Sequence, residues 1–540
     1  MKGQTREHVV GSHLVIMRHV IQRSLRWAAV WGAVFGLFVI STVVAYVKAY
    51  PTFNMRLELT RSLRPFVILL GVPWHAETVA GFATWRVLTA VAVIGAIWGL
   101  QTSTGLLRGD EEEGRWELLL AGPVTKRRAA AQALLGMAVA LALMYLVTML
   151  FILAAGRLPG ARFSPVGSLL FAINLVSGAA MFLALGALTS QIGATRAQAT
   201  TLGAGILGAS FVVRAIADSE NRLGWLRWLT PLGWIEELRP LRDPQPVALV
   251  PVAAMIFACV ALTLVLAGAR DLHGSVLRGS EGRRGTTWWL VGPTTLALYV
   301  SQLTAIGWLA GVIGLSAMFG SVVRASVSLT STSPAITAAL GRFGVRTATR
   351  GFLGFALFFV AVLLALMAAG QIGAMRDEEA SGRLDNLLVR PVHRLTWLAG
   401  RLCVALGLII LGGFAAGAAS WAGAATHHTY VPLQTLLEAG LNAAVPGIFV
   451  LGIGTLTLGL LPRSCATVSY AIVAWSFLAD LLGTFVKGGD WLRQSSLFTH
   501  ISLAPAEKPD WDTAAIIVLL GLIALALGAA GFQRRDLAYQ

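Results

Sequence analysis

The sequence predicts an all-α polytopic membrane protein with about 12 transmembrane helices, arranged as two parallel six-helix repeats. The chain of 540 residues is 56% hydrophobic and 13% charged, which is too apolar for a soluble protein and sufficient for about a dozen spans of roughly 20 residues. A block of charged residues occurs twice, 268 positions apart. Each half also closes on Arg-Asp-Leu, at 270–272 and at 535–537. Together these observations indicate an internal duplication.

The charged block is the densest cluster of charge in the chain and runs from Arg108 to Arg127. Its second copy starts at Arg376 and repeats the acidic cluster, the glycine, the second acid, the leucine pair and the proline in the same order. A single charged run between two spans is usually a solvated loop, but the repeated order indicates a shaped surface. Trp116, Leu119 and Leu120 lie at i, i+3 and i+4, which predicts a short amphipathic helix.

The first half begins with residues 8–26, whose apolar and basic positions alternate at helical spacing and predict a helix lying in the membrane interface. Long apolar runs then predict six spans, at about 27–47, 85–107, 129–154, 166–189, 198–216 and 247–267. Residues 48–84 contain three prolines between apolar stretches. We expect this segment to be partly helical at the outer surface.

A glycine- and arginine-containing linker at 273–292 separates the halves, which predicts a first transmembrane domain at 1–272 and a second at 293–540. Pro293 is expected to open a second interfacial helix. Six further spans are expected at about 303–323, 351–375, 397–421, 438–461, 466–486 and 513–531. Because six is an even number, the two halves should face the same way, related by a pseudo-twofold axis along the membrane normal.

Basic residues are nearly balanced between the two sides of the predicted membrane. The short connections that share a side with the charged blocks are the basic ones, and these are the loops that determine orientation. We therefore place the N-terminus, both blocks, the linker and the C-terminus in the cytoplasm. The net charge of +16 is spread over many loops, which favours contact with anionic lipids of the plasma membrane and argues against a nucleic-acid partner.

Opposite charges occupy equivalent places in spans five and eleven. An alignment at an offset of 266 sets Arg214 against Asp480. Because a charge near the bilayer centre costs roughly 3 kcal/mol, each needs a partner or water. The two residues could pair across the pseudo-twofold axis, or each could lie near the outer mouth, with Asp218 and Glu220 serving Arg214.

Two aligned asparagines, Asn174 and Asn442, are further pathway candidates, although each could instead bond a neighbouring helix. No metal site is predicted, since His427 and His428 have no third ligand nearby. Glycines spaced four apart predict close helix packing. These pairs are Gly32 with Gly36, Gly307 with Gly311, and Gly413 with Gly417.

The two charged blocks resemble the connection between spans two and three of type-2 ABC exporter permeases. The double length and the repeated endings are similar to actinobacterial permeases for tetronasin-like polyketide antibiotics and other drugs. In that family this connection is a coupling helix that docks on a cytoplasmic ATPase subunit. The resemblance assigns this role to Asp110, Glu111, Gly114, Glu117, Leu119 and Pro123, and to Glu378, Glu379, Gly382, Asp385, Leu387 and Pro391. The second copy departs from the first at Ala380, Ser381 and Asn386, so the two docking sites should be unequal.

The resemblance implies the membrane subunit of an ATP-driven exporter for hydrophobic or amphiphilic compounds, working with two copies of a separate ATPase. The chain has no Gly-Lys dipeptide and hence no Walker A loop. We therefore expect no catalytic or cofactor site here, with ATP and Mg bound by the partner. The alternative is a proton-driven secondary transporter with twelve spans. It would need titratable groups at membrane depth. The sequence offers few such candidates, namely Glu438, Asp480 and Arg214.

Overall fold

The computed structural model describes residues 14–63, 67–120, 124–219, 221–269, 292–332, 348–389, 392–426, 431–483 and 490–535. Throughout these ranges the ordered elements are helices and none is a strand, which confirms the all-α class. Eleven helices in the described ranges are long and apolar enough to cross a membrane. The chain divides into two compact units, Met1–Arg283 and Arg284–Gln540.

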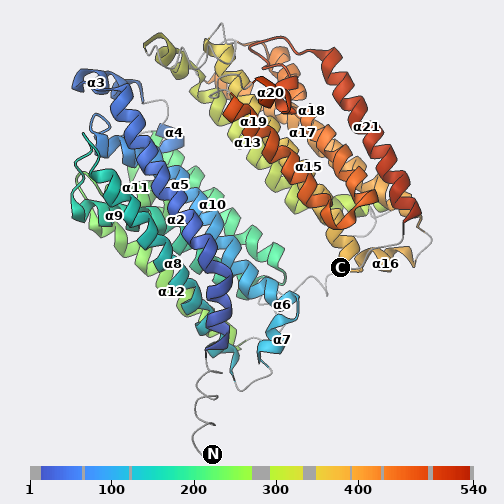
Figure 1. The fold of residues 1–540 in the computed structure, drawn as a ribbon, viewed down its shortest axis with the longest axis horizontal. Coiled ribbons are helices and arrows are strands. Elements are labelled where there is room, and N and C mark those ends of the chain that lie inside the picture. The colour runs from blue at the N-terminus through green and yellow to red at the C-terminus, as the bar shows by residue number, and fades with distance from the viewer. Residues whose placement is uncertain are drawn as a thin grey trace, which may run out of the picture. The chain divides into compact units, whose positions relative to one another are not determined.

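The first unit contains six of these spans, in the order that the hydropathy predicts (Figure 1). They are built on α2 (Val15–Ala49), α5 (Val79–Thr104), α8 (Lys126–Gly156), α9 (Pro165–Ile192), α10 (Arg196–Ser219) and α12 (Leu249–Ala269). Short helices occupy the two long connections between spans. These are α3 (Phe53–Ser62) and α4 (Val67–Leu70), then η3 (Asn221–Leu229), α11 (Pro231–Glu237) and η4 (Pro246–Ala248). The expected helical character of 48–84 is thus confirmed.

The second unit repeats this order (Figure 1). Its long helices are α13 (Pro293–Thr332), α15 (Ala348–Ala380), α17 (Arg394–Ala425), α18 (Leu433–Leu460), α19 (Cys465–Gly483) and α21 (Trp511–Arg534). Its short helices outside the charged block are η6 (Pro462–Ser464), α20 (Asp490–Gln494) and η7 (Phe498–His500). All but α19 are among the eleven candidate spans. The predicted span at 466–486 overlaps α19 and extends past the last described residue of that helix.

The expectation of separate interfacial helices before the first span of each half is wrong. Helix α2 is 35 residues long and α13 is 40, so at about 1.5 Å per residue each exceeds the roughly 30 Å of a bilayer core. Neither helix contains a glycine or proline between its first described turn and the predicted span. The backbone hydrogen bonds therefore continue, and the amphipathic segment is an extension of the span.

Several spans begin at a polar side chain that satisfies the first free backbone N–H groups. Thr78 accepts from Gly81 N at 3.0 Å, and Ser164 accepts from Gly167 N at 3.0 Å. Asp510 accepts from Thr513 N at 3.2 Å. Such N-caps are each worth about 1 kcal/mol. These N-caps determine the residue at which each of these long helices begins.

The same helix pairs pack together in both units. Helix α2 packs on α8 and α5 on α9 in the first unit, as α13 packs on α17 and α15 on α18 in the second. Helices α9 and α18 are the most buried spans of their units, while many large apolar side chains of α12 and α21 are exposed, as lipid contact requires. The internal duplication thus extends to packing. The pseudo-twofold axis stays a prediction.

Close helix packing is confirmed for two of the three glycine pairs. A Cβ on Gly32 would lie 2.8 Å from Met144 O, and one on Gly413 would lie 2.6 Å from Gly440 O. The prediction is wrong for Gly307 and Gly311, because no atom of the described part of the chain lies within 4 Å of a Cβ at either position. Equivalent sequence positions therefore need not have equivalent neighbours.

We predict that Gly417→Val destabilises the second unit by about 1–3 kcal/mol, since the new side chain would overlap the carbonyl oxygen of Leu436 on α18. Gly407→Val on the same helix is the matched control, because Gly407 is exposed and no described atom lies within 4 Å of a Cβ there. Thermal unfolding of both purified variants measures the difference. Equal losses would mean that helix propensity, and not the contact with α18, accounts for the effect.

Candidate functional site

Both copies of the charged block fold into the same local shape. A membrane-spanning helix runs into the acidic residues, a glycine turns the chain, and a six-residue helix follows. In the first copy α5 continues through the π-helix η2 (Gly105–Gly109) and α6 (Asp110–Glu112) into the turn and then α7 (Arg115–Leu120). In the second copy α15 leads through the turn to α16 (Arg383–Leu388). The sequence repeat is therefore also a structural repeat.

The two turns depend on glycine. Gly114 and Gly382 have φ angles of 72° and 70°, which lie in the left-handed region that costs other residues roughly 1–2 kcal/mol. No described atom lies within 4 Å of a Cβ added at either position. The backbone conformation, and not lack of space, is thus what requires glycine at both turns.

The first acids of block one are buried and held by arginines. Asp110 is 3% exposed and Glu111 is 2% exposed. Asp110 accepts hydrogen bonds from Arg23 of α2 at 2.7 Å and from Arg115 of α7 at 2.5 Å. Glu111 pairs with Arg108 at 3.1 Å. These contacts join α2, η2, α6 and α7.

The second block uses its acids in the same way. Glu379 is 2% exposed and accepts two bonds from Arg535, at 2.5 and 2.7 Å. Arg376 lies 3.5 Å from the same carboxylate, in the place that Arg108 occupies relative to Glu111. Glu378 bonds Arg401 of α17. The block is therefore tied to the C-terminal end of α21 as well as to α17.

Three of the acids assigned to the coupling role are buried. The carboxylates of Asp110, Glu111 and Glu379 are enclosed in ion pairs, and their coupling role stays a prediction. An unpaired buried charge is too costly to retain in so apolar a protein. The sequence showed no partner for these acids. Arg535 could have been proposed from the sequence as a partner of these acids, because it belongs to the Arg-Asp-Leu ending that both halves share.

The exposed surface of each block includes acids before the glycine, Glu112, Glu113 and Asp377, and residues that follow it. Glu117 is exposed and Leu118 is 79% exposed on α7. After α16, Val389 is 88% exposed, and Asp385 within that helix is partly buried. Leu387 is also partly buried and packs against the core of the second unit. Pro123 and Pro391 lie outside the described residues, as does the side chain of Leu119.

The predicted amphipathic helix is correct for its inner face. Trp116 is 8% exposed, and its indole N–H donates to Leu106 O in η2 at 3.2 Å. Leu384, at the equivalent place in α16, is 1% exposed. Each short helix therefore packs on the bundle through its apolar side chains, with Leu120 and Leu387 partly buried against the cores of their units.

The first block also contacts the connection between α9 and α10. Arg108 Nε donates to Ala194 O at 3.0 Å, and the backbone N–H of Arg196 donates to Glu112 at 2.6 Å. Thr200 and Thr104 hydroxyls lie 3.1 Å apart. Both connections on this side of the first unit consequently form one bonded surface.

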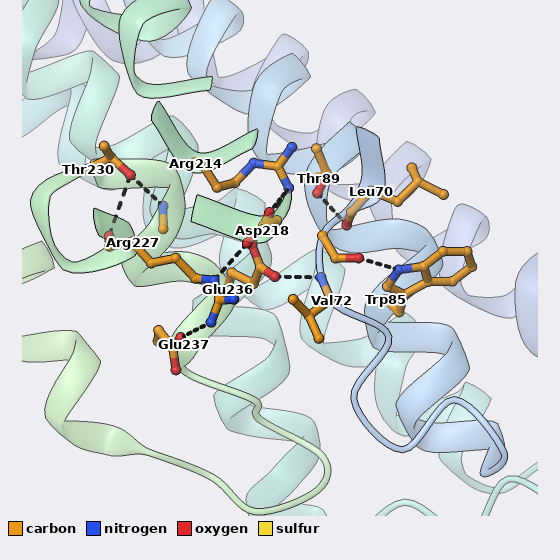
Figure 2. Close-up of polar contacts among 12 residues, drawn as sticks. Leu70, Val72, Trp85, Thr89, Arg214, Asp218, Arg227, Thr230, Glu236 and Glu237 are labelled. Atoms are coloured by element: carbon orange, nitrogen blue, oxygen red, sulfur yellow. Dashed lines mark hydrogen bonds and ion pairs between the residues drawn. The ribbon is translucent and has the colours of Figure 1, made fainter. Parts of the chain in front are cut away.

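A second charged cluster surrounds Arg214 in the first unit (Figure 2). Arg214, which is 1% exposed, lies 3.2 Å from Asp218 and 3.6 Å from Glu236. Arg227 donates to Asp218 at 2.6 Å and to Glu237 at 2.8 Å. Arg214 thus has carboxylate partners within its own unit, which was the alternative to a pair with Asp480. Glu220 lies outside the described residues.

The same cluster fastens the loop that precedes α5. Glu236 accepts from Val72 N at 2.6 Å (Figure 2). Burial, together with the neighbouring Asp218, raises the pKa of Glu236 to about 7. Asp480 in the second unit has different hydrogen-bond partners. Its carboxylate accepts hydrogen bonds from Ser496 Oγ at 2.7 Å and from the Thr499 hydroxyl.

The aligned asparagines differ in their contacts. Asn442 donates to Ser502 O at 2.8 Å, so it fastens a connecting segment to α18. Asn174 on α9 is fully buried, and its amide has no hydrogen-bond partner among the residues that the structure describes. His427 and His428 lie outside those residues.

Two family models match the chain, one over each half. Residues 14–272 match an ABC-2 family transporter protein, and residues 290–533 match the C-terminal domain of the multidrug efflux system permease Rv1217c. The first half of the chain is thus similar to ABC-2 family transporters, and the second half to an efflux permease. It is 25% identical to the multidrug efflux system permease protein Rv1217c of Mycobacterium tuberculosis (strain ATCC 25618 / H37Rv), over 97% of this chain and 95% of that protein.

The matches support a double-length ABC-2 permease, the transmembrane subunit of an ABC exporter. Such a subunit works with ABC ATPase subunits, and the candidate spans make it a multi-pass membrane protein. The matches do not support the proton-driven alternative.

We predict that Glu379→Gln destabilises the second unit by about 3–5 kcal/mol, because it leaves the Arg535 and Arg376 guanidinium groups without a buried counter-charge. Glu117→Gln makes the same chemical change at an exposed acid and should stay within about 0.5 kcal/mol. Thermal unfolding of the purified variants measures both. If Glu379→Gln unfolded like the wild type, the ion pairs would not anchor the block.

Proposed function

We propose that α7 and α16 are the two coupling helices of an exporter that moves hydrophobic or amphiphilic compounds, drugs among them, out of a bacterial cell. Each helix would dock on one copy of a separate ATPase subunit. The proposal rests on one observation. In each block, buried ion pairs hold the turn in place, while residues after the turn are exposed.

The outward residues offer the chemistry of a docking surface. Leu118 and Val389 are largely exposed, and burying one such side chain against a partner contributes about 1.5–3 kcal/mol. Glu117 adds an exposed carboxylate beside Leu118. The second block has Asn386 where the first has Leu118, which supports two docking sites of unequal affinity.

The buried ion pairs supply the rigidity that coupling needs. A force on α7 reaches α2 through Arg115, Asp110 and Arg23. The acids just before α16 are bonded by Arg401 of α17 and by Arg535 at the end of α21. A force on α16 would therefore be passed to both of these helices. Short charge-assisted bonds resist deformation better than neutral ones, so docking would move whole spans.

The rest of the assembly follows from this role. Both termini and both blocks would lie in the cytoplasm, with the spans in the plasma membrane. ATP and Mg would be bound by the two partner subunits. Export of drugs is supported by the printed name of the mycobacterial relative, a multidrug efflux permease, and by the apolar character of the spans.

We predict that Glu117→Lys inserts into the membrane and folds like the wild type but loses ATPase binding and export, because the charge is reversed on the docking face. Glu58→Lys, at an exposed acid of α3 in the same unit, is the control for charge reversal. Co-purification of the ATPase and export of a fluorescent drug are the two measurements. Full ATPase binding and export by Glu117→Lys would show that α7 is an ordinary loop helix.

We also predict that the purified chain alone neither binds nor hydrolyses ATP, since it contains no Gly-Lys dipeptide to form a phosphate-binding loop. Equilibrium binding of radiolabelled MgATP, with the reconstituted complex as positive control, measures this. Saturable nucleotide affinity in the isolated chain would contradict the expectation.

A further inference from the structure

An apolar groove of about 710 Å³ lies in the second unit between α18, α19 and α21. Helix α18 packs on both of the other helices, whereas α19 and α21 make little contact with each other in the described part of the chain (Figure 1). Phe449 and Ile453 of α18 therefore form the floor. The walls carry aliphatic side chains of α19 and α21, namely Val468, Ala471, Ile472, Ile516, Ile517 and Leu520. A smaller cavity of about 190 Å³, lined by phenylalanines beside Asp480, shares no lining residue with the groove.

One end of the groove is polar. Ser495, Ser496 and His500 line it from the connection between α19 and α21, and Thr513 lines it from the first turn of α21. The other end of α21 lies at the charged block, because Arg535 directly after the helix bonds Glu379 of that block. The polar end of the groove is therefore the end away from the charged block.

The connection that forms the polar end is fastened to α19. Ser495 Oγ accepts a hydrogen bond from the indole N–H of Trp475 at 3.1 Å. Ser476 Oγ accepts the backbone N–H of Leu497 at 3.2 Å, and Ser210 in the first unit accepts a backbone N–H of α11 in the same way, at 3.1 Å. The polar end is thus a fixed part of the groove.

The apolar end is closed by tight helix packing. Gly521 directly follows Leu520, and a Cβ on Gly452 of α18 would overlap its carbonyl oxygen. Further along α21, a Cβ on Gly528 would overlap the backbone of Thr455. Small residues let two helix backbones approach this closely. Beyond Leu520, α18 and α21 therefore leave no space between them.

The length of the groove matches one leaflet of a bilayer. From Thr513 to Leu520 helix α21 advances about 10 Å, and from Ser476 to Val468 helix α19 advances about 12 Å, at roughly 1.5 Å per residue. Half of a bilayer core is about 15 Å thick. A groove that is polar at one end and this long has the dimensions of one lipid chain below its headgroup.

The groove opens on an apolar surface. Trp475, Ile516 and Leu520 line it and are exposed, and Leu519 and Leu527 continue the exposed apolar surface along α21. In a membrane such a surface contacts hydrocarbon, because no water is present there. An apolar gap left empty would lose dispersion contacts along its whole lining. A cavity of about 150 Å³ accepts one benzene ring, so the groove is ample for one acyl chain.

We propose that this groove is a binding site for one phospholipid of the leaflet away from the charged blocks. One acyl chain would lie along Phe449 and Ile453, and the headgroup would lie at the polar end beside His500 and Thr513. The hydroxyls and the imidazole there can exchange hydrogen bonds with a headgroup. The site is independent of the proposed coupling role, since it involves neither α7 nor α16.

The test measures phospholipid that stays bound when the bilayer is removed. The full chain is reconstituted in bilayers of radiolabelled dioleoylphosphatidylcholine, extracted with dodecyl maltoside and separated from free lipid by gel filtration. Ala471→Trp places an indole in the groove and should lower the retained lipid by about one molecule per chain, since there is room for one chain. Ala474→Trp, at an exposed position of the same helix outside the lining, should retain as much lipid as the wild type.

A second pair of variants tests the opposite wall. Leu520→Trp narrows the groove from α21 and should lower the retained lipid in the same way as the change on α19. Leu519→Trp is the matched control, because Leu519 and Leu520 are both exposed and only Leu520 lines the groove. Neither pair alters a fully buried residue, so both variants of each pair should fold.

A photoreactive lipid locates the retained molecule. Phosphatidylcholine with a diazirine at the end of one acyl chain replaces a small part of the lipid, and the extracted complex is irradiated and analysed by peptide mass spectrometry. Adducts are expected on Ile453, Val468 or Leu520, at the apolar end of the groove, and not on His500.

Three results would overturn the site. They are a wild type that retains no lipid, equal retention by the groove variants and their controls, and adducts confined to residues outside the lining. If another part of the chain covered the groove, adducts would be absent from the lining, which is the third result. The assay contains no ATPase, so Glu117→Lys should retain lipid normally, and failure of coupling is distinguishable from failure of this site.

Discussion

The structure depends on carboxylates that are buried at the ends of apolar helices and neutralised there by arginine. A protein with 13% charged residues has few charges to place in its interior, and each must find a partner because an isolated buried ion is too costly. Arg108 with Glu111 and Arg376 with Glu379 are the same contact made twice, three residues apart on one helix. Around each pair the chain turns at a glycine and presents a short helix.

These ion pairs join elements that are far apart in the sequence. Arg23 precedes Asp110 by 87 positions and Arg535 follows Glu379 by 156. A docking helix held only by its own turn would yield when pushed, whereas one held by α2, or by α17 and the end of α21, must carry those helices with it. The ion pairs therefore connect each short exposed helix to other helices of its unit.

The two units share a scaffold and differ in what fills it. The order of spans, their packing partners and the serine bonds of α10 and α19 recur. At the end away from the blocks, the first unit buries a network around Arg214 that also holds Val72 (Figure 2). The second keeps a phenylalanine-lined cavity beside Asp480. The two units therefore share helix order and packing partners and differ in the side chains at this end.

The sequence by itself determined the class, the spans and the two blocks, because hydropathy and the length of apolar runs follow from local composition, and repetition is visible without a structure. It also identified the inner face that begins at Trp116, since helical periodicity is local. Only the tertiary structure decided that Asp110, Glu111 and Glu379 point inward, that Arg214 is served by Asp218 and Glu236, and that Gly307 has open space. Those outcomes depend on which distant residues meet across the bundle, and a linear pattern does not specify its partners.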